Sequence, residues 1–216
     1  MLQGDPILRR RGHGYSRAGV FNEILSSGVF ATVYGPLEIP VPPSSGSLPE
    51  SVVIKKTVVE SPKCPIVSER IPGSEFALAH AEVILLERLG NHPNIIGVRD
   101  VFLADVVEEE RAATRGKSCL SLCVVLEWFG ESCEAIRFRP LGFRPDQIRC
   151  VLFDVASALD YVHSFKIIHA DVKTTNILVA ALDEAVEVGK QGTHAKLCDF
   201  NSSLQAVIYL INKLTH

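Results

Sequence analysis

The order of the predicted elements indicates an α+β fold, in which a lobe built on a β-sheet precedes a mostly helical lobe. Strand patterns dominate the chain up to residue 129. One long helical pattern interrupts them at residues 74–90, and a second follows at residues 145–164. Because strands come first and the second helix comes later, the sequence predicts two lobes of different composition.

The strand patterns of the first lobe differ in how they bury apolar residues. The stretch "FNEILSSGVFATVYG" predicts two short strands around a Ser-Gly turn, and "SVVIKKTVV" alternates as a strand does. The run "CLSLCVVLEWF" is continuously apolar and predicts a buried strand. Between the first two, "PLEIPVPPSSGSLPE" predicts a loop, because proline removes backbone donors and fixes φ.

The first helix is predicted over "SEFALAHAEVILLERLG", which Ser74 can cap and Gly90 can end. Its apolar residues recur at helical spacing, at Phe76, Ala79, Val83 and Leu86. After it, "NHPNIIGVRDVFLADVV" leads into another strand, and "EEERAATRGKS" predicts a charged hairpin tip.

The second helix is predicted to begin at Pro145, since proline suits the first turn of a helix. One face is predicted to carry Ile148, Val151, Leu152, Val155, Leu159 and Val162. Beyond the helix, a polar insert, "DEAVEVGKQGTH", precedes the short strand "AKLCDF".

The composition excludes some partners. The chain has 216 residues, 47% of them apolar, and a formal net charge of -3, so no global positive field favours nucleic acid or anionic membrane. Residues 1–20 are unperiodic and predicted to be disordered, with Arg9–Arg11 as a solvated basic cluster. No apolar run approaches the ~18 residues of a membrane span, so we expect an intracellular protein of the cytoplasm or nucleus.

Six cysteines, at positions 64, 119, 123, 133, 150 and 198, show no C-x-x-C spacing. They lie mostly within apolar runs, and no histidine or cysteine pair nearby completes a metal site. We therefore expect free, buried thiols in a reducing compartment.

The stretch "IIHADVKTTNILV" places a carboxylate, an amine and an amide inside an apolar frame. Asp171, Lys173 and Asn176 lie so close together that burying them without partners would be costly. Taken alone, this pattern also fits a local Asp171–Lys173 ion pair with Asn176 in a turn. His169 is predicted to be a structural, hydrogen-bonded core histidine.

Four segments in a specific order, "SSGVFATVY", "VVIKK", "HADVKTTN" and "CDFN", resemble the eukaryotic protein kinase family, most closely its serine/threonine type. The resemblance covers residues 21–203 and includes the spacers "LERLGNHPNII", "VVLEWF" and "ALDYVHSFKIIHADVK". It implies an antiparallel sheet lobe with one long helix, followed by a partial, mostly helical lobe.

The resemblance implies a phosphoryl-transfer site with ATP and Mg²⁺ as cofactors and a protein hydroxyl as acceptor. Asp171 would orient the substrate hydroxyl and accept its proton. Lys173 would neutralise charge on the transferring phosphoryl group. Asn176 and Asp199 would bind Mg²⁺, for which oxygen ligands are suited.

The resemblance also assigns residues of the first lobe to the nucleotide. Lys55 would contact the α- and β-phosphates, with Glu82 as its ion-pair partner. The nucleotide pocket would be lined by Leu25, Gly28 and Val33. The base would bond backbone groups of Glu127 and Phe129.

Four positions depart from the family pattern. In the glycine-rich loop, Ser26 and Ala31 replace glycines and only Gly28 remains, so the backbone has less freedom to close on phosphates. Asn201 stands where the family has glycine, although asparagine tolerates positive φ. Ala170 replaces an arginine that binds an activation-segment phosphate in many relatives. None of these changes removes a residue assigned to metal binding or proton transfer.

The sequence after Asn201 lacks an activation segment and the family's later helices. We expect a C-terminally truncated kinase domain at residues 21–203, with its lobes at 21–129 and 130–203. Residues 204–216 are predicted to form a short amphipathic tail. Its apolar helical face would carry Leu204, Val207, Ile208, Ile211 and Leu214.

Three functions stay open at this stage. The first is an ATP-dependent serine/threonine protein kinase or its catalytic fragment. The second is a pseudokinase-like module that binds nucleotide or partners without turnover. The third, a small-molecule phosphotransferase, is disfavoured by Lys173 and by the "HPNII" and "VVLEWF" blocks.

Overall fold

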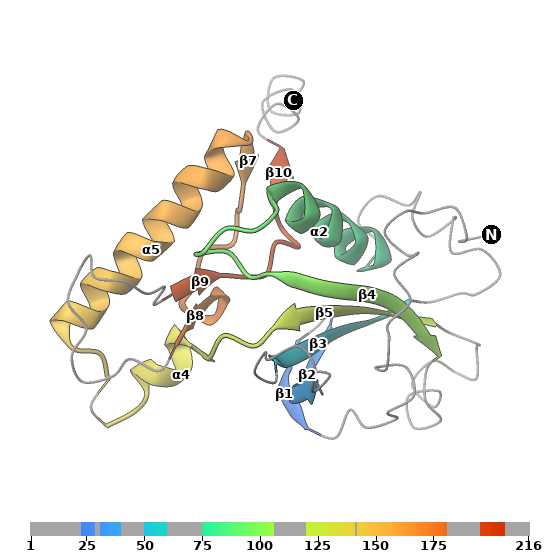
Figure 1. Cartoon of the computed structure of the whole chain (residues 1–216), viewed down its shortest axis with the longest axis horizontal. Coiled ribbons are helices and arrows are strands. Elements are labelled where there is room, and N and C mark those ends of the chain that lie inside the picture. The colour runs from blue at the N-terminus through green and yellow to red at the C-terminus, as the bar shows by residue number, and fades with distance from the viewer. Residues whose placement is uncertain are drawn as a thin grey trace, which may run out of the picture. The chain divides into compact units, whose positions relative to one another are not determined.

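The computed structural model describes residues 23–28, 31–39, 50–59, 75–105, 120–140, 142–180 and 195–205 (Figure 1). The chain divides into two compact units. The first combines Met1–Ile84 with Val98–Trp128, and the second combines Leu85–Gly97 with Phe129–His216. The predictions for residues 1–20, 108–118 and 183–194 concern segments outside the described residues.

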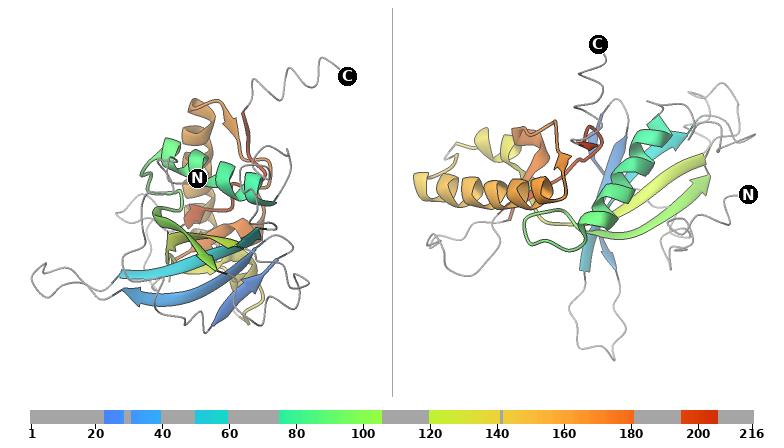
Figure 2. Two further views of the ribbon diagram at one scale, coloured as in Figure 1. Left: turned by 90° about the vertical axis from the view of Figure 1, so that its right-hand side faces the viewer. Right: turned by 90° about the horizontal axis from the view of Figure 1, so that it is seen from above.

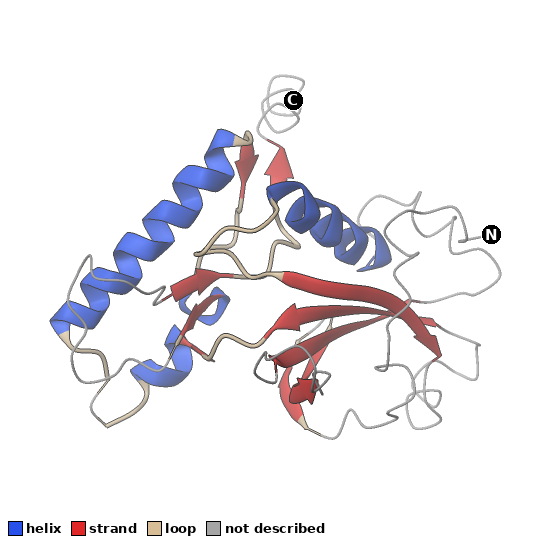
Figure 3. Ribbon diagram, viewed as in Figure 1, coloured by secondary structure: helices blue, strands red, loops and turns tan. Residues whose placement is uncertain are grey.

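The first unit contains a five-stranded antiparallel sheet of order β1-β2-β3-β5-β4 (Figure 3). Its strands are β1 (Ile24–Ser27), β2 (Thr32–Ile39), β3 (Glu50–Val59), β4 (Val98–Asp105) and β5 (Leu120–Glu127). The sheet lobe predicted from the sequence is thereby confirmed.

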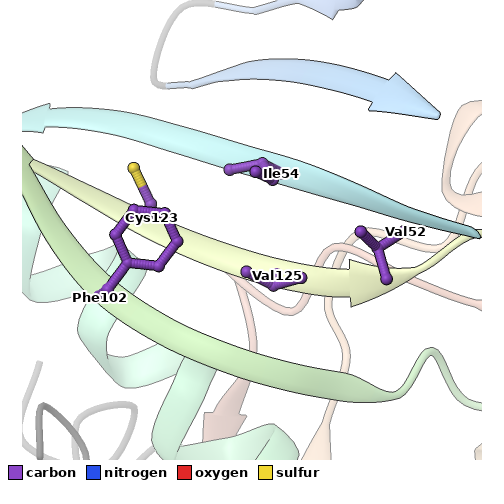
Figure 4. Close-up of a cluster of buried hydrophobic side chains, with 5 residues drawn as sticks. All are labelled: Val52, Ile54, Phe102, Cys123 and Val125. Carbon is purple, nitrogen blue, oxygen red and sulfur yellow. The ribbon is translucent and has the colours of Figure 1, made fainter. Parts of the chain in front are cut away.

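The register of β3 and β5 decides which side chains face the sheet's apolar cluster. Ile54 pairs with Val125, and Lys55 pairs with Val124. Because side chains alternate along a strand, Ile54 and Lys55 lie on opposite faces. The apolar cluster on the Ile54 side is buried and consists of Val52, Ile54, Phe102, Cys123 and Val125 (Figure 4).

Strand β2 continues where the sequence predicted a loop. The prediction from Pro36 onward was wrong as far as Ile39, since Leu37 pairs with Val52 of β3. The β2–β3 register shifts between Tyr34 and Leu37, so the proline falls at an irregularity where a missing donor does not interrupt the ladder.

Helix α2 (Glu75–Leu89) confirms the first predicted helix. Figure 2 shows from two further sides that it runs over one face of the sheet. Its end agrees with the prediction, because Gly90 adopts φ +63° and donates its N–H to the carbonyl of Leu86 at 3.0 Å. Ser74, the predicted cap, lies outside the described residues.

Residues 85–97, which the sequence places in the sheet lobe, pack with the second unit. Ile95 forms a parallel bridge with Leu197, and the Ile96 N–H donates to the Leu197 carbonyl at 3.0 Å. The hydroxyl of Tyr161 also donates to the carbonyl of Leu89 at 2.6 Å. These contacts join the end of α2 and the following loop to the second unit.

The second unit is built from α5 (Pro145–Ser164) and several short elements. These are β6 (Glu131–Ser132), α4 (Cys133–Arg137), β7 (Ile167–Ile168), η3 (Thr174–Asn176), β8 (Ile177–Val179), β9 (Ala195–Leu197) and β10 (Leu204–Gln205). The short strands form the sheets β6-β8-β9 and β10-β7. Among the described residues, no helix is both long and apolar enough to span a bilayer.

The predicted face of α5 is only partly the buried one. Val151, Val155 and Val162 are buried, but Ile148 and Leu152 are 44% and 63% exposed. The buried arc instead continues through Cys150, Asp154 and Ala158. The reason is the position of β9, since Asp154 bonds the backbone of Ala195 and turns that side of the helix inward.

The predicted C-terminal helix does not begin at Leu204. Leu204 and Gln205 form β10, which pairs antiparallel with Ile168 and Ile167 of β7. The correction follows from this pairing, because strand partners satisfy the backbone groups of these two residues. The remaining residues of the predicted tail lie outside the described ranges.

Replacement of Gly130 tests the close packing of the second unit. Gly130 has φ +136°, and a Cβ built there would lie 2.1 Å from the Val179 carbonyl oxygen. We expect Gly130→Ala to lower the free energy of unfolding by at least about 3 kcal/mol, from backbone strain and overlap together. Chemical denaturation measures this loss.

The matched control is Gly90→Ala. Gly90 also has positive φ, but an added Cβ would meet nothing within 4 Å. This change is expected to cost only about 1–2 kcal/mol, the usual strain of a left-handed conformation. Equal losses in the two variants would contradict the packing at Gly130.

Candidate active site

A buried ion pair lies on the face of β3 opposite the apolar cluster. The Lys55 Nζ atom lies 2.8 and 3.0 Å from the two carboxylate oxygens of Glu82 on α2. Lys55 is 7% exposed and Glu82 is 2% exposed. Burial of both charges is costly, so the short bidentate geometry is needed to offset the loss of hydration.

The other predicted nucleotide residues of the first unit lie on the sheet and its first hairpin. Val33 of β2 pairs directly with Lys55 of β3, so their side chains share a face. Leu25 lies on the exposed strand β1. Glu127 ends β5 and forms an ion pair with Arg99 at 3.1 Å.

Gly28 does not need the special freedom of glycine in this hairpin. Its N–H donates to the Ala31 carbonyl at 2.9 Å, and its φ is not positive. An added Cβ would meet only the Ala31 carbonyl oxygen, at 3.6 Å. The replacement of neighbouring glycines by Ser26 and Ala31 therefore bears on contact with a ligand, not on strain at Gly28.

In the second unit, three side chains of the "HADVKTTN" segment are joined by hydrogen bonds. Lys173 Nζ lies 2.7 Å from Asp171 Oδ2, and Asn176 Nδ2 donates to the same oxygen at 3.0 Å. Asn176 also donates to the Asp171 backbone carbonyl at 2.9 Å. The simple ion pair is thus present, but Asn176 belongs to the same network.

This network controls the charge of its members. The hydrogen bond from Lys173 is the main reason why the pKa of Asp171 lies below its ordinary value. Correspondingly, the bond to Asp171 raises the pKa of Lys173, to which the charge of Asp199 also contributes. Asp171 is therefore an anion and Lys173 a cation at neutral pH.

His169 anchors the segment, as the sequence predicted for a core histidine. Its ring Nε2 lies 3.0 Å from the Cys198 carbonyl oxygen, and its Nδ1 accepts the Asp171 N–H at 3.3 Å. The two contacts together require a neutral ring with the proton on Nε2. Burial lowers the pKa of His169, which favours this neutral form. The ring of Phe200 packs against its edge, with centroids 4.6 Å apart.

Asp199 lies two residues after the end of β9 and has φ +63°, a conformation uncommon for residues other than glycine. Ala170, between His169 and Asp171, has φ +64°. Asn201, in contrast, does not have positive φ, so this position needs no glycine. Its side-chain Oδ1 is buried without a partner in the described part of the chain.

Phe129, assigned to the nucleotide by its backbone, is the first residue of the second unit's longer segment. The Lys196 Nζ lies 5.1 Å from the centre of its ring. This cation–π contact links Phe129 to β9, three residues before Asp199.

The polar side chains of the second unit fit a hard divalent cation. Asp199 and Asn176 offer oxygen atoms, which Mg²⁺ prefers. Among the described residues, no three His, Cys, Asp or Glu side chains gather as a metal site. A cation here would therefore take further oxygens from water or from phosphate groups, as Mg²⁺ commonly does.

Four cysteines of the described residues are thiols that form no disulfide. Cys123, Cys133 and Cys150 are buried, and Cys198 is half-buried. Burial raises the pKa of Cys133 to about 11, which makes this thiol unreactive. Cys64 and Cys119 lie outside the described residues.

Three polar contacts were missed by the sequence analysis. Glu134 of α4 accepts a hydrogen bond from the Thr174 hydroxyl and forms an ion pair with Arg137. The Ser203 hydroxyl donates to the His169 carbonyl at 3.2 Å. Only the i, i+3 spacing of Glu134 and Arg137 was visible in the sequence. The other partners are distant along the chain.

Comparison with known proteins agrees with this arrangement. A family model described as "Protein kinase domain" matches residues 51–208. Mouse "Serine/threonine-protein kinase Nek5" is 31% identical over 155 residues, which cover 70% of this chain and 21% of the relative. The chain therefore belongs to the protein kinase family.

Two further relatives show the same kind of match. Xenopus laevis "Ribosomal protein S6 kinase 2 beta" is 31% identical over 126 residues, covering 57% of this chain and 17% of the relative. Arabidopsis thaliana "Serine/threonine-protein kinase SRK2C" is 32% identical over 124 residues, covering 57% and 30%. The chain thus spans less than a third of the length of these curated relatives.

Loss of the Glu82 carboxylate is expected to destabilise the first unit strongly. Glu82→Gln leaves the buried ammonium of Lys55 without the anion that binds it. The expected decrease in the free energy of unfolding is about 3–5 kcal/mol, measured by denaturant titration. Arg99→Gln, which breaks a more exposed pair, is expected to cost ~1 kcal/mol or less. A loss in Glu82→Gln no greater than in Arg99→Gln would contradict the burial of the pair.

Acidification is expected to destabilise the second unit. The pKa of His169 is lower in the folded chain than its ordinary value of 6.5, so the unfolded chain binds a proton more readily. Stability contributed by the neutral ring is complete above pH ~6.5 and is lost as the pH falls through the folded pKa. Thermal unfolding at pH 7.5 and 5.5 measures this decrease.

The histidine responsible can be identified by substitution. His169→Gln is expected to show a smaller fall in melting temperature between the two pH values, whatever its absolute stability. His163→Gln, at an exposed position of α5, serves as the control. Part of the pH response is expected to remain in His169→Gln, because burial also lowers the pKa of His92. An unchanged pH response in His169→Gln would contradict the assignment.

Proposed function

We propose that this chain transfers the γ-phosphoryl group of Mg·ATP to a serine or threonine hydroxyl of a protein. The observation that supports this most is the Asp171 carboxylate, held by Lys173 at 2.7 Å and Asn176 at 3.0 Å. The matched family model and the similarity to kinases named as serine/threonine-specific support the same reaction.

Asp171 is proposed to orient the acceptor hydroxyl. Because its pKa is lowered, the carboxylate is ionised at neutral pH and ready to accept the hydroxyl's hydrogen bond. The attacking oxygen forms its bond to the γ-phosphorus while the bond to the ADP oxygen breaks, and the hydroxyl proton passes to Asp171. A low-pKa base is sufficient, since the loose transition state of phosphoryl transfer needs little early proton removal.

Lys173 is proposed to stabilise the negative charge of the transferring group. Its ammonium is held near the reacting oxygen by Asp171, and its raised pKa keeps it protonated. A lysine ammonium has three N–H donors. One of them bonds Asp171, so two can donate to other groups.

Asp199 and Asn176 are proposed to hold Mg²⁺. When bound, such a cation withdraws charge from the phosphate oxygens and fixes their orientation. Asn176 can supply its carbonyl oxygen to a cation because its Nδ2 group is the one that donates to Asp171. The positive φ of Asp199 supports this role, because strained backbone occurs preferentially at functional positions.

Lys55 is proposed to bind the α- and β-phosphates, with Glu82 holding its ammonium in place. The nearby apolar residues Leu25 and Val33, together with Gly28, would contact the nucleotide. The backbone groups of Glu127 and Phe129 would bond the adenine base. Each of these roles carries over from the matching motif position.

Activity should depend on individual polar side chains. With Mg·ATP and a generic basic protein, Asp171→Asn is expected to lower kcat roughly 10²–10⁴-fold. Asp199→Asn is expected to raise the Mg²⁺ concentration needed for half-maximal transfer. Asp160→Asn, an equivalent change at an exposed position of α5, should leave transfer unchanged. Radiolabelled phosphate incorporation measures all three.

Other outcomes favour a different function. Transfer that persists in Asp171→Asn would contradict its role, and unchanged Mg²⁺ dependence in Asp199→Asn would contradict the cation assignment. Thermal stabilisation by nucleotide without any phosphate transfer would favour the module without turnover. A ligand at 100 times its Kd stabilises by ~2.7 kcal/mol, so such binding is measurable.

A further inference from the structure

A buried carboxylate on α5 lies outside the set of residues assigned so far. Asp154 is 7% exposed, and its Oδ2 accepts the backbone N–H of Ala195 at 2.8 Å. We propose that Asp154 is a positioning residue, which fixes the start of β9 and, through this strand, the place of Asp199. The second part of this inference rests on the proposed function, because it concerns the cation that Asp199 would bind.

The surroundings of Asp154 make a carboxyl group without hydrogen bonds costly. Ala195 is fully buried and belongs to an apolar cluster with Cys133, Val151, Val155 and Val179, and two of these residues come from α5 itself. An acceptor in such a place is retained only if its hydrogen bonds offset the loss of hydration. A charge-assisted bond to a backbone N–H is among the stronger ones available. The bond to Ala195 therefore fixes the strand end firmly.

From Ala195 onward, the backbone of β9 is held from both sides. The Ala195 carbonyl accepts from Asn94 Nδ2 at 3.2 Å, and the Leu197 N–H donates to the Asn94 carbonyl at 2.9 Å. The Leu197 carbonyl accepts from the Ile96 N–H at 3.0 Å. Asp154 is thus the first member of a continuous series of backbone contacts along the strand.

The same series reaches the polar network. The Cys198 N–H donates to the Asn176 carbonyl at 3.0 Å, and the Cys198 carbonyl contacts His169 Nε2 at 3.0 Å. Asp199 is the next residue. Its positive φ is costly by itself and persists only where the neighbouring structure determines it. The hydrogen bonds along residues 195–198 supply that determination.

The short length of β9 explains why its start matters. The strand has three residues, so few ladder bonds hold it. Asp199 lies only four residues beyond Ala195, at most ~14 Å along an extended chain. Release of the strand's first N–H is therefore expected to loosen the start of β9 and, through the following residues, the position of Asp199.

The first experiment measures order in β9 without reference to activity. Amide hydrogen exchange of Leu197 and Cys198 is compared in the full chain and in two variants. Asp154→Leu keeps a similar volume but removes the acceptor, whereas Asp154→Asn keeps an acceptor oxygen. Asp160→Asn is the control, because Asp160 is an exposed residue of the same helix.

We expect Asp154→Leu to accelerate exchange of Leu197 and Cys198 roughly tenfold, while amides near the middle of α5 change little. Asp154→Asn should restore most of the protection. Equal protection in wild type and Asp154→Leu would overturn the proposal. Faster exchange that extends equally through α5 and β7 in both variants would also overturn it, because it would show a general structural role.

The second experiment concerns Asp199. Binding of a non-hydrolysable ATP analogue is measured by calorimetry over a range of Mg²⁺ concentrations. Asp154→Leu is expected to raise the Mg²⁺ concentration for half-maximal binding roughly tenfold, because losing a group that supports a metal ligand weakens the affinity for the metal. Asp154→Asn should return this concentration toward that of the wild type. Unchanged Mg²⁺ dependence in Asp154→Leu would overturn the link to Asp199.

The two proposals fail in different ways. Absence of nucleotide binding by the wild-type chain would count against the proposed function, and the exchange of Leu197 and Cys198 would still decide the role of Asp154. Normal binding and transfer by the wild type, with identical exchange in Asp154→Leu, would leave the proposed function standing and remove the positioning residue.

Discussion

The hydrogen bonds around Asp171 are the interaction on which the second unit's polar segment depends. Lys173 and Asn176 both bond one oxygen of its carboxylate, and Asn176 also bonds its backbone carbonyl. His169 receives the Asp171 N–H and reaches Cys198 on the other side. His169 and Asn176 are buried and must find polar partners, so their bonds to Asp171 and Cys198 help to determine the path of residues 169–176.

In the first unit, the buried polar groups that need a partner carry opposite charges. Lys55 and Glu82 lose most of their hydration, and their short bidentate contact helps to offset that loss. Such a pair contributes little net stability compared with apolar side chains of the same volume. Its retention in the central strand of a well-packed sheet is better understood as the fixing of an ammonium group at one place.

Most of the long elements could be predicted, because their patterns repeat over many residues. Helices α2 and α5 and strands β3 and β5 each span eight residues or more. Strands β6, β7 and β10 have two residues each, too few for any period, and exist because a partner strand is near. The α5 face was mistaken at Ile148 and Leu152, since no local pattern shows that a polar Asp154 faces the interior.

The sequence by itself determined which polar residues could act together over short distances. Asp171, Lys173 and Asn176 lie within six positions, so local chain geometry already brings them near one another. Only the tertiary structure decided the distant partners: Lys55 with Glu82, 27 residues apart; His169 with Cys198, 29 apart; and Asp154 with Ala195, 41 apart. The physical reason is that spacing along the chain sets geometry only within a turn or a strand, whereas contacts over tens of residues depend on how the core packs.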